Sequence, residues 1–459
     1  MLTAETPTAM IHYRRPLVPA GGRMITMGVP DPAVYALIVR FLQALLQPTH
    51  ATSFAALTAL VWAVLCAQSL HPADLVRALP DLTTPHARQA FRRVRRGLKR
   101  TCLTSHYLTP LLVRAVLRLV PEAEVLMVLD STRADRWEVF TLGVRYHGRV
   151  LPVAWSVLPY PWPKGQFTPT VVALLERTLA GWPADRPVHL VADRGFPSTA
   201  LFRLLHAQHP RLALGSTIRL RVGDWVHLAD GQTVKVADLV GGLRPGQWRT
   251  WAAGYPHCQA GPGPTQLVAG RGLPSYPPHQ MGPADWARRQ ARAEARARHL
   301  RSKGQPGAVA TDDSWCLLTT AATWQAAVTQ YSGRFSTEGA YRDIKSWGWE
   351  AVVGREPDPA VVDGLTGLAV VSYLVQASIG AVAGRTRQAG ARARQRQWTT
   401  TDRLSVFSRG RLVLHDRAYD WRPWLTTVLP ALTQRLRSEP QPNMSPMPLP
   451  HPQLRQEAA

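Results

Sequence analysis

Residues 331–350, YSGRFSTEGAYRDIKSWGWE, carry a phenol, two cations and an acid at helical spacing, and these are Tyr331, Arg334, Glu338 and Lys345. At about 100° per residue, the four side chains fall within about a 60° arc of one helix face. Such a stripe is commonly a solvated face with ion pairs four residues apart. The segment just before it, residues 315–318, has the apolar pattern of a buried strand, which indicates that the helix packs in a core. We therefore expect the polar stripe to line a cleft.

Two aspartates follow apolar runs that are typical of central strands. Asp130 comes directly after residues 125–129, and Asp193 comes directly after residues 188–192. Ligands of α/β sheets gather at the carboxyl ends of such strands, so both side chains are expected at one edge of the sheet. Carboxylates on two strand ends and one helix can hold two divalent cations about 3.5–4 Å apart. The sequence therefore predicts that Asp130, Asp193 and Glu338 are catalytic ligands of two magnesium ions, with manganese as a substitute.

In this order, the motifs resemble those of the DDE transposases of bacterial insertion sequences, in the subgroup with a Tyr-x2-Arg-x3-Glu-x6-Lys signature. The signature is matched without a gap from Tyr331 to Lys345, and residues 129–132 and 192–196 are similar to the family's two aspartate motifs. The resemblance covers about residues 120–385. It implies a ribonuclease H-like core, and metal-dependent DNA strand cleavage and strand transfer at the inverted-repeat ends of a transposable element.

The same residues indicate how DNA would be held. Lys345, Arg334 and Arg194 are candidates for binding backbone phosphates, and the resemblance implies that Tyr331 also contacts a phosphate near the cut. A helix rises about 1.5 Å per residue, so residues 331–345 span about 21 Å and should follow several phosphates. The resemblance implies inverted-repeat ends and target DNA as partners, and a homodimer in the synaptic complex. Relatives form a DNA hairpin during excision, and the sequence leaves open whether this chain does so.

The composition favours a nucleic-acid partner. Among 459 residues, 54 Lys and Arg outnumber 30 Asp and Glu, which gives a formal charge of +24 and a pI near 11.0. An excess of this size predicts a polyanionic ligand, although a bias toward Arg codons would also raise the pI. The four cysteines show no Cys-x2-Cys pair, so neither a disulfide framework nor a zinc site is expected. With no signal-peptide pattern at the N-terminus, we expect a cytoplasmic, nucleoid-associated protein.

The N-terminal region contains the outline of a helix-turn-helix. A short helix is expected at residues 72–79, followed by a turn and by a basic helix that Thr83 or Thr84 could cap. The candidate DNA-binding residues on the second helix are Arg88, Arg92, Arg93 and Arg96. The alternative is a basic amphipathic helix that only packs within the N-terminal bundle. A further Arg-rich helix, at 284–301, is another candidate for DNA contact, and the alternative is a solvated run of charges.

The order of elements after residue 124 predicts an α/β fold. The expected strands are 125–129, 137–146, 149–158, 187–192 and 211–215, with helices between the later ones. The first three would be antiparallel, and this order is that of a ribonuclease H-like core with a mixed five-stranded sheet and helices. The 145 residues between Asp193 and Glu338 are too many for one loop. We therefore expect a mainly β insertion that interrupts the core, as the resemblance also implies.

The predicted domains follow one another in chain order. They are an α-helical N-terminal DNA-binding domain at 1–120, the first part of the ribonuclease H-like core at 121–215, an insertion domain at 216–311, the second part of the core at 312–385, a C-terminal helical region at 386–438 and a disordered tail at 439–459. The uncharged stretch 364–384 is long enough to span a bilayer, but its polar residues favour a helix buried in the core. No membrane partner is therefore expected.

The sequence thus predicts a transposase that excises and integrates an insertion sequence. One alternative is a ribonuclease H-like nuclease or resolvase, which would cut DNA without strand transfer. A second alternative is a catalytically inactive descendant that only binds DNA. The presence of an acid at all three positions argues against this second alternative.

Overall fold

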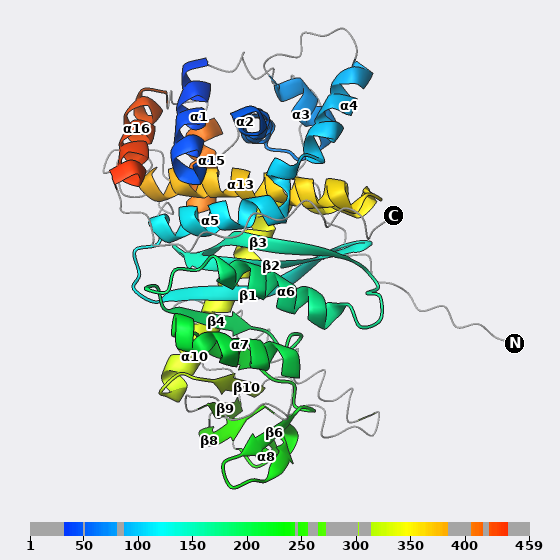
Figure 1. Ribbon diagram of the computed structural model, residues 1–459, viewed down its shortest axis with the longest axis vertical. Helices are drawn as coiled ribbons and strands as arrows, with labels where there is room; N and C mark the ends of the chain where they lie inside the picture. Colours follow the sequence, from blue (N-terminus) through cyan, green and yellow to red (C-terminus); the bar gives the residue numbers. More distant parts are fainter. Residues whose placement is uncertain are drawn as a thin grey trace, which may run out of the picture.

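The computed structural model shows an α/β protein in which a layer of helices covers one end of a long mixed sheet (Figure 1). The strands follow one another along the longest axis of the molecule, and the helix layer lies at one end of that axis (Figure 1). The structure describes residues 32–48, 51–79, 87–243, 247–255, 265–271, 302, 314–383, 405–415 and 422–438. The tail predicted at 439–459 and the Arg-rich helix predicted at 284–301 lie outside the described residues.

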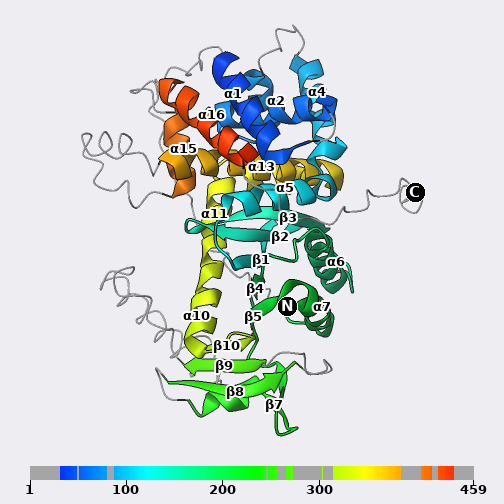
Figure 2. The same cartoon turned by 60° about the vertical axis from the view of Figure 1, so that its left-hand side comes forward.

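The first part of the core contains five strands and two crossover helices. These are β1 Val125–Ala134, β2 Trp137–Tyr146, β3 Arg149–Pro159, α6 Phe167–Ala180, β4 Val188–Ala192, α7 Thr199–Leu212 and β5 Gly215–Arg219. β1 and β3 each pair antiparallel with β2, whereas β4 pairs parallel with both β1 and β5. Parallel strands need a crossover connection, and α6 and α7 provide it on one face of the sheet (Figure 2).

The sheet does not stop at the five strands that the sequence predicts. The further elements are β6 Trp225–Leu228, β7 Thr233–Lys235, α8 Val236–Gly241, β8 Trp248–Gly254, β9 Gln266–Arg271 and β10 Ser314–Thr319. In the described residues the strand order is β3-β2-β1-β4-β5-β10-β9-β8-β6-β7. β10 pairs antiparallel with both β5 and β9, so the strands of the predicted insertion extend the core sheet.

The strand predicted at 211–215 is wrong. Residues up to Leu212 belong to α7, because Leu201, Leu205 and Leu212 keep a helical spacing and are buried together. Ala213 then ends the helix in the left-handed conformation, with φ 45°, and the strand begins at Gly215. The domain boundary predicted after residue 215 therefore falls at the start of β5, a strand that belongs to the core sheet.

The signature segment is not one uninterrupted α-helix. It comprises α10 Trp324–Ser332, a 3₁₀ turn at Gly333–Phe335, α11 Ser336–Lys345 and, after a break, α12 Trp349–Arg355. α10 and α11 run along the face of the sheet opposite α6 and α7 (Figure 2). The 3₁₀ turn lies close to β1, so a Cβ at Gly333 would meet the terminal methyl of Leu126 and that side chain would have to move.

The layer of helices is built around α13. Its members are α1 Pro32–Leu46, α2 Ala51–Ala67, α3 Pro72–Ala78, α4 Ala87–Leu98, α5 Ser105–Leu119, α13 Pro359–Ala383, α15 Val406–His415 and α16 Arg422–Ser438. α13 packs against α2, α15 and β3. Within the described residues it is the one single helix long and apolar enough to cross a membrane, and 94% of its most apolar window is buried inside the protein. α2 and α3 pass the same test only as one pair bent by 101°.

We expect Gly364→Ala to lower the free energy of unfolding by about 1–3 kcal/mol, the cost of overpacking a core. A Cβ at Gly364 of α13 would collide with the carbonyl of Leu98 at the end of α4, so one of the two helices must move. Urea denaturation measures the loss. The matched control is Gly241→Ala in α8, where an added Cβ meets nothing within 4 Å. Equal stability of the two variants would contradict this packing.

Candidate active site

Strand register brings Asp130 and Asp193 side by side. The last parallel pair of β1 with β4 is Leu129 with Ala192, and the next residue on each strand is an aspartate. Residues in matched parallel register point to the same face of a sheet, and neighbouring strands lie about 4.8 Å apart. Contrary to the prediction, Asp130 does not end its strand, because β1 continues along β2 to Ala134. The two carboxylates therefore lie where β4 leaves the sheet.

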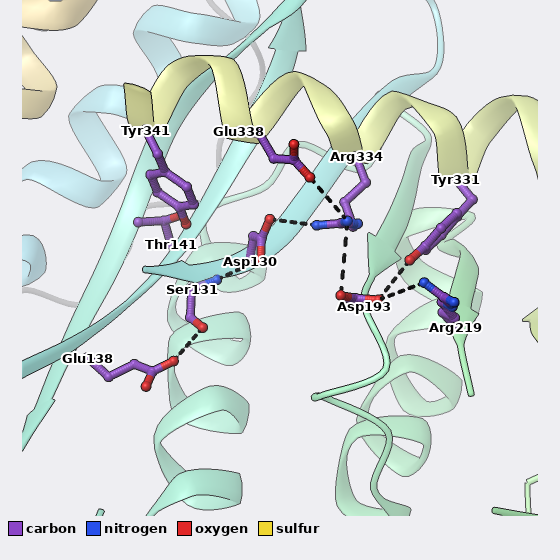
Figure 3. A network of polar contacts seen from close by, with 10 residues as sticks. All are labelled: Asp130, Ser131, Glu138, Thr141, Asp193, Arg219, Tyr331, Arg334, Glu338 and Tyr341. Carbon is purple, nitrogen blue, oxygen red and sulfur yellow. Dashed lines mark hydrogen bonds and ion pairs between the residues drawn. The ribbon is translucent and has the colours of Figure 1, made fainter. Parts of the chain in front are cut away.

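The guanidinium of Arg334 joins the three predicted acids (Figure 3). Its Nη1 donates to Oδ2 of Asp130 at 2.9 Å. Its Nη2 lies 4.0 Å from Oδ2 of Asp193 and 3.7 Å from Oε1 of Glu338. Because Nη2 of Arg334 is close to both oxygens, the carboxylate oxygens of Asp193 and Glu338 can lie no further apart than the sum of these two distances. The Arg334 side chain is 9% exposed, so a buried positive charge faces three negative ones.

The surroundings of the two aspartates shift their pKa values in opposite directions. Burial raises the pKa of the Asp130 carboxyl to about 6, against the attraction of Arg334. Burial also opposes the ionisation of Asp193, yet Arg334, the N–H of Arg194 and the Tyr331 hydroxyl together hold the pKa of Asp193 below its ordinary value. Asp193 therefore stays charged at neutral pH, whereas Asp130 takes up a proton in weakly acidic solution.

Tyr331 and Arg334 lie beneath the carboxylates and not at the surface. Tyr331 is 0% exposed, and its hydroxyl donates to Oδ1 of Asp193 at 2.8 Å. Burial raises the pKa of the Tyr331 phenol above its ordinary value, which keeps it a hydrogen-bond donor. Arg219 of β5, which is absent from the sequence prediction, lies 3.9 Å from the same Asp193 oxygen. Tyr331 and Arg334, which the sequence predicts as DNA contacts, are engaged with Asp193 and Asp130 in the structure.

Glu338 and Lys345 occupy the more open part of the helix face. The Glu338 side chain is 57% exposed. The Nζ of Lys345, whose side chain is 31% exposed, lies 3.2 Å from Glu350 of α12. Arg194 is exposed, and its carbonyl accepts a hydrogen bond from Nε of Arg221 at 2.9 Å. The predicted stripe thus has its first two members buried in the site and its last two nearer to solvent.

A fourth acid next to the site, Glu138 of β2, is missing from the sequence candidates. It is 9% exposed, and its carboxylate accepts from the Ser131 hydroxyl at 2.6 Å and from the Trp162 indole N–H at 3.2 Å. The N–H of Ser131 in turn donates to Asp130 at 2.9 Å, so Glu138 reaches Asp130 through one residue. The sequence does contain a sign of this role, because Glu138 lies inside the apolar strand pattern WEVFTLGV. An acid buried in a strand needs hydrogen-bond partners.

The acids provide the hard oxygen donors that magnesium prefers. As the described side chains are placed, no three His, Cys, Asp or Glu residues are close enough to hold a metal ion. The guanidinium of Arg334 lies among the three carboxylates and supplies the positive charge there. The donor set therefore fits magnesium by its chemistry, while its spacing in this structure fits the guanidinium.

The basic helix of the predicted helix-turn-helix is α4, and it is anchored to the segment between α12 and α13. Arg95 contacts Glu356 at 2.6 Å, and Lys99 contacts Asp358 at 2.5 Å. The exposed arginines of α4 are Arg92, Arg93 and Arg96. Arg88 also lies on α4, but its side chain, like the turn before the helix, is outside the described residues. The ion pairs thus leave a separate set of arginines at the surface.

No protein-family model matches the sequence, and no curated protein matches it significantly. The chemistry of the site must therefore be inferred from its residues. These are two aspartates in matched strand register, a glutamate on the facing helix and a guanidinium among the three carboxylates.

We expect Arg334→Gln to destabilise the protein in a pH-dependent manner. Removing one partner of a buried ion pair costs about 3–5 kcal/mol, and the lower value applies here because Glu338 is largely exposed. The fold raises the pKa of Asp130, so the folded state favours the protonated carboxyl and gains stability at low pH. This contribution to the free energy of unfolding is lost as the pH rises through about 6. Without Arg334 that pKa is higher still, so the variant falls further behind wild type above pH 6.

Urea unfolding at pH 5 and pH 8 checks this prediction, with a larger deficit expected at pH 8. The matched control is Arg77→Gln, which breaks the exposed pair with Asp74 and should change little at either pH, because exposed pairs contribute about 0–1 kcal/mol. A deficit of the same size at both pH values would show that Arg334 does not hold the Asp130 charge.

Proposed function

We propose that the chain is a DNA transposase of the insertion-sequence type, which cuts DNA at the inverted-repeat ends of an element and transfers those ends to target DNA. The observation that carries the proposal is the meeting of two register-matched aspartates with Glu338, on a helix with Tyr-x2-Arg-x3-Glu-x6-Lys spacing, around one guanidinium. The formal charge of +24 supports a nucleic acid as the ligand.

The proposal includes a ribonuclease H-like core that is interrupted by an insertion. The strand order β3-β2-β1-β4-β5 supports it, with β2 antiparallel to both of its neighbours and β4 parallel to both of its own. The strands β6 to β9 come between β5 and β10 in the chain, and α10 and α11 follow β10. Asp130 and Asp193 thus precede the insertion, and Glu338 follows it.

Cleavage of a phosphodiester requires an activated water or 3′-hydroxyl and a stabilised leaving oxygen. When bound, two magnesium ions, or manganese in their place, supply both of these effects. Asp130 and Asp193 would hold them, and Glu338 would reach in from the exposed side of the helix. Tyr331 fixes the orientation of Asp193 through its 2.8 Å hydrogen bond. Lys345, at the open end of the helix, would bind a backbone phosphate.

Binding of the element ends is proposed for α4, with α3 before it. Its exposed arginines can contact phosphates, while Arg95 and Lys99 fix the helix to the body of the protein. The indole N–H of Trp137 on β2 donates to the carbonyl of Glu356 at 2.7 Å, so the segment that anchors α4 also contacts the strand beside β1. Two chains, acting as a homodimer, would hold two element ends and a target in one complex in the nucleoid.

The competing functions use the same site with different outcomes. A ribonuclease H-like nuclease or resolvase would cut DNA and leave the ends unjoined. A catalytically inactive descendant would bind DNA and cut nothing. Incubation with element ends and a target plasmid in magnesium distinguishes the three functions. A transposase yields joined products, a nuclease or resolvase yields cut but unjoined DNA, and an inactive descendant leaves the DNA uncut.

We expect Glu338→Gln to bind element ends normally but to cut them at least about 100-fold more slowly, because one ligand of the metal site is lost. Cleavage is measured on a plasmid that carries both ends, and binding is measured by mobility shift. Glu176→Gln, at an exposed glutamate on α6, is the matched control and should cut at the normal rate. Normal cleavage by Glu338→Gln in magnesium would remove Glu338 from the site.

We expect the triple variant Arg92→Ala, Arg93→Ala, Arg96→Ala to show a weaker dependence of DNA affinity on salt. Each phosphate contact contributes about −0.9 to the slope of log affinity against log salt concentration, so the slope should flatten by about one unit per lost contact. Fluorescence anisotropy over a salt series measures this slope. If α4 also reads bases, the preference for inverted-repeat DNA over random DNA should fall as well.

The matched control for the salt series is Arg95→Ala on the same helix. Arg95 pairs with Glu356 at 2.6 Å, so its loss should lower stability and leave the salt slope of the folded protein unchanged. An unchanged slope in a fully folded triple variant would exclude the exposed arginines of α4 from the DNA interface.

A further inference from the structure

One further side chain belongs to the polar stripe that carries the acid site. Tyr341 lies three residues after Glu338 and four before Lys345, so the stripe continues at alternating offsets of three and four from Tyr331 onward. Residues at these offsets share one face of a helix. Figure 3 shows Tyr341 pointing from α11 toward the strands, on the same side of the helix as Arg334 and Glu338.

The Tyr341 hydroxyl contacts β2 directly beside the first aspartate. It shares a hydrogen bond with the hydroxyl of Thr141, and the two oxygens are 2.5 Å apart. Thr141 is buried, and it pairs with Asp130 across the β1–β2 ladder. Residues directly opposite each other in an antiparallel pair project to the same face, with Cβ atoms about 4.5–5.5 Å apart. The hydroxyl pair therefore joins α11 to the sheet at the position next to Asp130.

The phenol of Tyr341 contributes geometry to this place and no charge. Burial raises the pKa of Tyr341 well above its ordinary value, and the negative charge of Asp130 raises it further. The hydroxyl therefore keeps its proton beside the carboxylate. A neutral phenol cannot balance the charge of the acids as Arg334 does, but it can hold the helix at a fixed place.

The hydroxyl pair completes the contacts that hold the helix over the acids. The hydrogen bonds from Tyr331 to Asp193 and from Arg334 to Asp130 both come before Glu338 in the chain. Glu338 itself is 57% exposed, so packing of its own side chain does not hold it in place. Tyr341 supplies the contact on the other side of Glu338, on the same face of the helix.

A second contact holds α11 from a different direction. Asp343 accepts from Nε of Arg149 on β3 at 2.7 Å. Asp343 is two residues after Tyr341, which places the two side chains about 200° apart around the helix. The Asp343 contact therefore holds the back of the helix, whereas the Tyr341 contact holds the face that carries Glu338.

Packing alone does not fix this end of the stripe. A small cavity lies beside the hydroxyl pair, and Thr132, Thr141, Tyr341 and Lys345 are among the residues that line it. Atoms that line a void lack contacts on one side, so their packing resists a shift of the helix less than a filled core would. The directional bond between the two hydroxyls is the contact that limits such a shift.

We propose that Tyr341 is a positioning residue for the metal-dependent reaction, and that its bond to Thr141 sets the position of Glu338 relative to Asp130. This inference rests on the proposed function and adds a residue that acts through the helix. Removing a side chain that orients a metal ligand typically changes metal affinity or activity about 10–100-fold.

The test removes the hydroxyl pair one oxygen at a time. Tyr341→Phe and Thr141→Val keep the shape of each side chain. Each should raise the magnesium concentration for half-maximal cleavage about tenfold, with little change in the rate at saturating magnesium or in the binding of element ends. The affinity of the DNA-free full chain for manganese, measured by electron paramagnetic resonance of the free ion, should fall by the same factor. The double variant should be no worse than either single variant, because both remove the same contact.

The matched control is Thr178→Val in α6. It also removes a buried hydroxyl, which donates to the carbonyl of Leu174 at 2.8 Å. Like the two site variants it should lower the stability measured by urea unfolding, but it should leave both metal measurements at their wild-type values.

The outcomes separate this inference from the proposed function. Site variants that lose stability but keep wild-type values in both metal measurements would show that Tyr341 only supports the fold. Additive losses in the double variant, or the same change in Thr178→Val, also overturn the inference. Each of these results, obtained with a wild type that cuts DNA in magnesium, leaves the proposed function standing. Wild type that neither binds manganese nor cuts DNA refutes both proposals.

Discussion

One buried guanidinium determines how the centre of this protein is arranged. Three carboxylates cannot be gathered at a sheet edge without a positive charge among them, because like charges that are partly removed from water repel strongly. Arg334 provides that charge from a 3₁₀ turn that lies close to β1. Arg334 is itself buried in this arrangement. Removing one partner of a buried ion pair lowers stability by more than the intact pair contributes to it. The acids and the turn therefore depend on each other.

The same constraint explains why the sheet continues through the insertion. α10 follows β10, which pairs with β5, and this places Tyr331 at the end of α10 against Asp193. β10 also pairs with β9, so the inserted strands are joined to the core by a ladder of backbone hydrogen bonds. A buried contact between Thr217 and Thr319, with hydroxyls 2.7 Å apart, adds a side-chain link across the same junction. The helix that carries Glu338 is thus positioned by both parts of the sheet.

Apolar periodicity and fixed spacing are local properties, so the sequence was sufficient for most helices and strands, and it singled out Asp130, Asp193 and Glu338, which the structure places around Arg334. It could not give what depends on strand register or on which neighbour faces a side chain. The helical spacing places Tyr331 and Arg334 on one face with Glu338, but only the packing on β1 and β4 shows that they are buried against the aspartates. The position of Glu138 could not be predicted, because the pairing of β1, β2 and β3 brings its partners Ser131 and Trp162 to it. The end of α7 was missed because its last buried leucine lies beyond Pro210.

The separation of Asp130 from Arg334 has a consequence for the order in which the protein is made. The two residues are 204 positions apart in the chain. Ribosomes add about 5–20 residues per second, so about 10–40 s pass between the synthesis of the acid and that of its cation. During this interval β1 and β4 can pair while their aspartates lack the charge that holds them together. The sheet edge at the site therefore gains its balancing charge only when the chain beyond the insertion has left the ribosome.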